Sequence, residues 1–128
     1  IVFEPAVKPA EVMPVAARSA DVGVFFTTLE TDQRHFTLPN KLFEYIGAGL
    51  AVAVSPAVDL RAVVESHGVG VVSADASIAA IADTINALTG EQVVAFKAAA
   101  RRAAGTLNWE CEREVLRAVL EPHLRRIA

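Results

Sequence analysis

Four short runs of β-branched and aromatic residues most constrain what this chain can fold into. Three of them are continuously apolar, without the alternation of a half-exposed strand, and this is typical of strands covered on both faces of a parallel sheet. The runs are Ile1–Phe3, Val22–Phe26, Ala51–Val54 and Val69–Val72. We therefore expect four strands of a buried parallel sheet.

Helical segments separate these runs and follow the last of them. The expected helices cover residues 9–19, 39–48, 59–66, 77–89, 91–104 and 108–127. Right-handed crossovers place such helices on both faces of an open parallel sheet. The sequence therefore predicts an α/β fold with a Rossmann-like open parallel sheet, as a single domain over residues 1–128.

Composition narrows the classes of function. The 128 residues are 53% hydrophobic and carry a formal net charge of −3, which argues against nucleic acid as the main partner. Cys111 is the only cysteine, which fits a reducing compartment, and we expect it to be a small buried hydrophobe. No apolar run approaches the ~18–20 residues that span a bilayer. The histidines have no metal-ligand spacing, so no structural metal is expected, and no cofactor is assigned.

The longest polar loop, residues 27–38, follows the second run and leads into a helix that begins PNKLFEY. Ligands of open parallel sheets bind at the carboxyl ends of the strands, so this loop is the first candidate for a site. Pro39 is favoured as the first helical residue, and the free N–H groups of that turn can bind an anion. Lys41 is electrostatically unfavourable there unless an external anion arrives.

Lys41 and Glu44 lie on one side of this helix, away from the apolar line of Leu42 and Ile46. Two interpretations stay open. Glu44 could face the crevice at the strand ends and accept hydrogen bonds from the two hydroxyls of a ribose, as carboxylates do in dinucleotide-binding folds. Alternatively, Lys41 and Glu44 form a solvated ion pair that binds nothing.

Several motifs together resemble a known family. They are ADVGVF, a polar loop, PNKLFEY followed by AGLAVAV, a GVGVV strand, and a terminal helix that opens with NW. This pattern is similar, from about Val2 to Leu120, to the carboxy-terminal half of retaining GT-B glycosyltransferases. In particular it resembles the large family that includes sucrose synthases and many bacterial polysaccharide and lipopolysaccharide transferases. The resemblance implies a domain that binds a nucleotide diphosphate sugar for transfer to a saccharide or lipid-linked acceptor.

The resemblance also implies roles for individual residues. Glu44 matches the family's second signature glutamate, which binds the ribose hydroxyls. Phe36 stands where the family has its first glutamate, which contacts the transferred sugar, so this position departs from the pattern. The backbone N–H groups of Thr37, Leu38 and Asn40 match those that meet the diphosphate and the sugar.

Two further residues complete the candidate nucleotide-sugar site. His35 could contact phosphate or sugar, and Lys41 stands beside the expected anion site. No catalytic residue is assigned.

Parts of the family's architecture have no counterpart in the chain. The family's two opening βα units and its acceptor domain have no counterpart here. We therefore expect a fragment of a larger enzyme that is inactive alone. In relatives the terminal helix, residues 106–128 here, crosses to the amino-terminal domain. The implied location is cytoplasmic, with peripheral attachment at the inner membrane face as a further option, because many relatives use lipid-linked acceptors.

A second class of function stays open: a non-catalytic Rossmann-like or flavodoxin-like module for partner binding or oligomerisation. If Ile1–Phe3 is an edge strand whose neighbours are missing, Val22–Phe26 has an unpaired edge that favours self-association. The residues expected to form the core are Leu42, Phe43, Ile46, Val52, Val54, Val69 and Val71.

Overall fold

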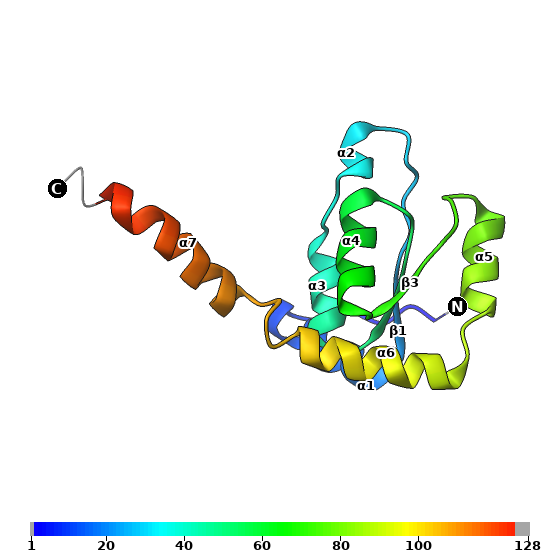
Figure 1. Cartoon of the computed structure of the whole chain (residues 1–128). Helices are drawn as coiled ribbons and strands as arrows, with labels where there is room; N and C mark the ends of the chain where they lie inside the picture. Colours follow the sequence, from blue (N-terminus) through cyan, green and yellow to red (C-terminus); the bar gives the residue numbers. More distant parts are fainter. Residues whose placement is uncertain (1, 125–128) are drawn as a thin grey trace.

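A three-stranded parallel sheet forms the centre of the chain, of which the computed structural model describes residues 2–124 (Figure 1). The strands are β1 (Val22–Phe25), β2 (Ala51–Val54) and β3 (Gly70–Val72), in the order β1-β2-β3. Every residue of β2 is buried, as its continuous apolar run predicts. The α/β class and three of the expected strands are confirmed, to within one residue at each end.

The strand expected at Ile1–Phe3 is wrong where the structure can be read. Ile1 lies outside the described residues, whereas Val2 and Phe3 are not in a strand and are 83% and 91% exposed. Three residues with no neighbouring strand gain no ladder hydrogen bonds to offset the entropy of ordering them. Within residues 2–124, β1 pairs with β2 alone, so its other edge is open, as the sequence led us to expect.

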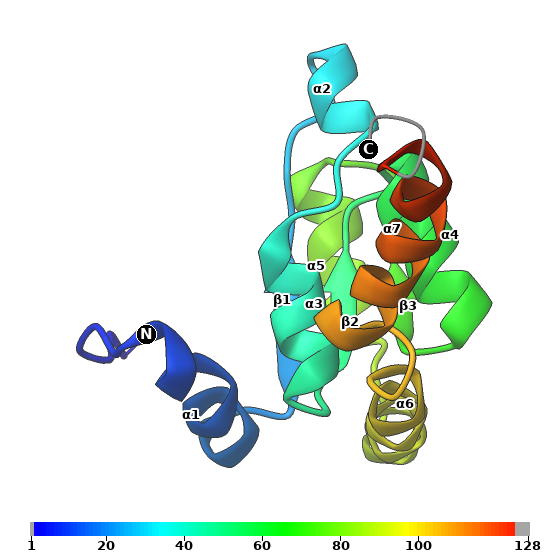
Figure 2. The ribbon, with the colours of Figure 1, turned by 90° about the vertical axis from the view of Figure 1, so that its left-hand side faces the viewer.

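Helices follow the strands in the predicted alternation. The elements are η1 (a 3-10 turn, Pro9–Glu11), α1 (Val12–Ser19), α2 (Asp32–His35), α3 (Asn40–Gly47), α4 (Val58–His67), α5 (Ile78–Asn86), α6 (Gly90–Ala103) and α7 (Trp109–Leu124). Figures 1 and 2 show α3 and α4 on one face of the sheet and α5 on the other, with α6 across the end opposite α2. The short helix α2 was not predicted. Its sequence signals are Thr31 at the N-cap and Asp32 in the first turn.

The core lies between the sheet and helices α3, α4 and α6. Its buried members are Leu42, Ile46, Val52, Val54, Ala57, Leu60, Val64, Val69, Ala99, Ala100 and Ala103. Five of the seven expected core residues are among them. Phe43 and Val71 are only partly buried, so those two expectations are wrong. Val71 pairs with Ala53, one step out of phase with the core-facing Val52 and Val54, and therefore faces the side of α5, a helix that buries none of its residues.

The last helix leaves the body of the molecule. Figure 1 shows α7 extending away from the sheet, and every residue from Trp109 to Leu124 is exposed. Cys111 is therefore exposed rather than buried, because nothing within residues 2–124 covers its part of α7. None of the helices described is long and apolar enough to cross a membrane.

Candidate functional site

Helix α3 begins one residue later than predicted. Pro39 is the N-cap, with an extended ψ of 148°, and Asn40 is the first helical residue. The backbone N–H of Leu42 donates to the Pro39 carbonyl at 3.0 Å, and no side chain caps the turn. Lys41 is exposed in this turn. The first turn thus presents backbone donors and one cation to solvent, as an anion site requires.

Glu44 lies one turn further along α3 and faces a hollow of about 560 Å³. The hollow is bounded by Asn40 and Gly47 of α3, by Met13 of α1, and by Ala104 and residues 107–110 at the α6–α7 junction. No loop that follows a strand lines this hollow, so Glu44 also faces a space away from the strand ends.

A second hollow, of about 440 Å³, adjoins the first. Asn40, Phe43 and Trp109 line both, and Trp109 is 63% exposed. We call the two together the α3–α7 groove. No sequence pattern predicts Trp109 here, because its position depends on the turn that brings the start of α7 beside α3. The NW dipeptide indicated where the last helix starts, but not which element that start would lie beside.

The α3–α7 groove is negatively charged. Its lining includes the carboxylates of Glu44, Glu110 and Glu112, and it includes no lysine, arginine or histidine. Lys41 forms no ion pair within residues 2–124, so the simple Lys41–Glu44 pair that the sequence left open is not formed. The pKa of the neighbouring Tyr45 phenol is raised mainly by burial, and the Glu44 carboxylate raises it further.

The remaining predicted site residues lie apart from this groove. His35 closes α2, and the half-buried Thr37 and the exposed Phe36 and Leu38 follow it. None of these four lines either hollow. The structure therefore brings Asn40 and Glu44 together and leaves residues 35–38 on the segment that leads into α3.

The loop after β1 has its own internal contacts. Arg34 contacts the Thr28 hydroxyl, and its Nη1 lies 3.4 Å from the Glu30 carboxylate. The backbone N–H of Thr27 donates to the Oγ of the fully buried Ser55 at 3.0 Å. The start of the loop is therefore tied to the carboxyl end of β2, while its tip is held by exposed side chains. Within residues 2–124, no three His, Cys, Asp or Glu side chains are grouped so as to hold a metal ion.

The fold places the chain among α/β proteins with a Rossmann-like open sheet. Comparison with protein-family models, with curated proteins and with solved structures found no match.

Proposed function

We propose that this chain is the donor-binding module of a retaining glycosyltransferase and binds a nucleotide diphosphate sugar. The observation that carries the proposal is that Asn40 and Glu44 line the same hollow, beside the uncapped first turn of α3. A half-buried carboxylate is a strong acceptor for a pair of ribose hydroxyls. The exposed N–H groups of the first turn, with Lys41 beside them, suit the diphosphate.

In this proposal the chain binds and orients the donor but does not complete the reaction. A saccharide or lipid-linked acceptor would be held by a separate domain, and the complete enzyme would work in the cytoplasm or at the inner membrane face. With Phe36 at the position of the family's first glutamate, recognition of the transferred sugar depends on other groups, for which His35, Thr37 and Leu38 are the candidates.

Calorimetric titration with UDP, GDP and ADP tests the proposal. We expect one of them to bind saturably, and Glu44→Gln to weaken it roughly 10-fold to 100-fold, the effect of losing hydrogen bonds to a charged group. Glu114→Gln is the matched control, because Glu114 is an exposed glutamate of α7 that does not line the groove. The absence of saturable binding to all three nucleotides would refute the proposal. Equal affinity in Glu44→Gln would remove Glu44 from the site.

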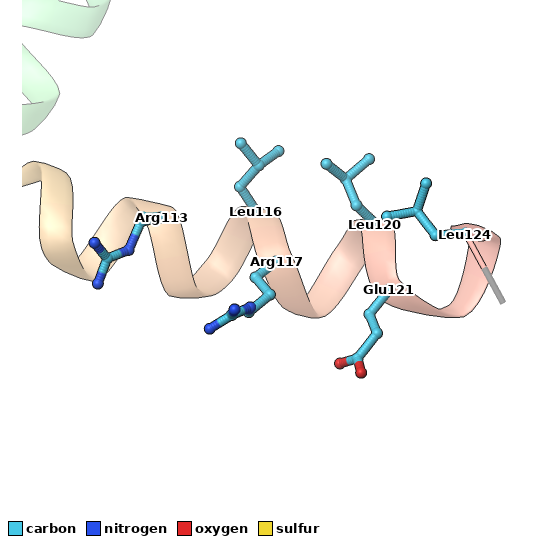
Figure 3. Close-up of a pocket in the computed structure, with 6 residues that line it drawn as sticks. All are labelled: Arg113, Leu116, Arg117, Leu120, Glu121 and Leu124. Atoms are coloured by element: carbon cyan, nitrogen blue, oxygen red, sulfur yellow. The ribbon is translucent and has the colours of Figure 1, made fainter.

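A second candidate function is a non-catalytic module for partner binding. The observation that favours it is the uncovered apolar side of α7, where Leu116, Leu120 and Leu124 project from the helix in one direction (Figure 3). The open edge of β1 adds a second surface of this kind. Sedimentation over a range of concentrations distinguishes the two surfaces. Leu116→Gln with Leu120→Gln would abolish association through α7, whereas Val24→Lys would abolish association through β1.

A further inference from the structure

Trp109 is the chain's only tryptophan, and it lines the α3–α7 groove. The residue is 63% exposed although it lines both hollows together with Phe43 and Asn40. A large aromatic face that is open to solvent within a hollow can stack a flat ring, and stacking tolerates any nucleobase because every base has a π-face.

The charges of the groove decide which part of a nucleotide fits it. Glu44, Glu110 and Glu112 repel phosphate, and no cation lines the groove to offset them. The same carboxylates accept hydrogen bonds from ribose hydroxyls and from the amino groups of bases. The uncharged half of the ligand therefore suits the groove, and the phosphates suit the first turn of α3 outside it.

We propose that the α3–α7 groove holds the nucleoside half of the nucleotide, with the base stacked on the Trp109 indole and the ribose at Glu44. The inference rests on the proposed function and deepens it, because it assigns the base to a residue at the start of α7. Asn40 lines both hollows and so stands between the base and the ribose, with its amide able to donate to either.

The single tryptophan supplies a direct test. Trp109 emission is followed while the nucleotide that binds best by calorimetry is added, then its nucleoside, and then inorganic pyrophosphate. We expect the nucleotide and its nucleoside to quench the emission saturably, at the concentrations at which they bind. Pyrophosphate should leave the emission unchanged, because it cannot enter the acidic groove.

Variants separate stacking from mere proximity. Trp109→Ala should weaken nucleotide binding roughly 5-fold to 100-fold by calorimetry, the range that stacking on one aromatic side chain supplies, and Trp109→Phe should restore most of it. Val119→Ala is the control on α7, because Val119 is 58% exposed and lines neither hollow. Circular dichroism checks that each variant is folded.

The possible results separate this inference from the proposed function. Nucleotide binding that leaves Trp109 emission unchanged and survives Trp109→Ala overturns the stacking assignment and leaves the proposed function standing. Failure of every nucleotide to bind by calorimetry refutes the proposed function, and the assignment of the base fails with it.

Discussion

The ring of Tyr45 lies directly against Gly23, so closely that a Cβ added at Gly23 would sit 2.3 Å from the ring's Cγ. The Tyr45 hydroxyl donates to the Val24 carbonyl at 3.3 Å. These two contacts hold α3 on β1 through the residue next to Glu44. The glycine is thus needed for space, and the position of the candidate site depends on it.

Gly23→Ala should therefore destabilise the fold by about 1–3 kcal/mol, the usual effect of overpacking. In a double-mutant cycle, the combination of Gly23→Ala with Tyr45→Ala should be less destabilising than the sum of the single changes, by roughly 1 kcal/mol. The control cycle pairs Gly23→Ala with Phe43→Ala, which should be additive because the atoms nearest the new methyl belong to Tyr45. Urea unfolding followed by circular dichroism measures each free energy, and additivity in the Tyr45 cycle would contradict the contact.

Gly70 is a second position at which a neighbouring strand leaves no room for a side chain. A Cβ there would meet the carbonyl oxygen of Val52, its register partner in the central strand, at 1.8 Å. The obstacle is backbone, so no side chain can move aside, and Gly70→Ala should cost about 3 kcal/mol or more. Gly90→Ala is the matched control, because a Cβ at Gly90 has nothing within 4 Å, and it should be close to neutral. Similar unfolding free energies for the two variants would mean that β3 pairs differently.

Adjacent residues of α3 should respond very differently to truncation. Leu42 is fully buried, so Leu42→Ala should cost about 2–5 kcal/mol. Phe43 is the larger side chain but is only partly buried and lines the α3–α7 groove, so we expect Phe43→Ala to cost less than half as much. Denaturant midpoints compare the two variants directly. A larger loss for Phe43→Ala would place that ring in the core, as expected from the sequence.

The local sequence pattern was sufficient to predict the three strands of the sheet. The run AVAV, buried at every position, becomes β2 without a residue of error, and Gly68 ends α4 with a φ of 59°, as the Gly after a helical pattern predicts. The same kind of composition at Val2 and Phe3 gave a wrong strand, because a strand also needs a neighbour and composition does not supply one.

The candidate site was harder to predict because it depends on contacts between distant parts of the chain. The sequence singled out Glu44 and Asn40, which the structure brings together. It could not place Trp109 beside them, since that follows from the course of the chain from α6 into α7. We expected Cys111 to be buried because a lone cysteine on a helix usually is, but whether anything covers α7 depends on contacts that the sequence does not show.

Tyr45 is the chain's only tyrosine, and its phenol has a raised pKa. Burial is the main cause that raises it, and the Glu44 carboxylate adds to the effect, so the absorbance of the tyrosinate should appear above the ordinary value of about pH 10. The folded state then holds this proton more tightly than the unfolded state does. The resulting stability is fully present below about pH 10 and is lost as the pH rises through the folded pKa.

Glu44→Gln removes the smaller cause, so the pKa of Tyr45 should fall but remain above that of a free tyrosine, whereas Glu114→Gln should leave it unchanged. A spectrophotometric titration gives all three values, and a Tyr45 pKa that ignores Glu44→Gln would mean that the carboxylate points away from the phenol.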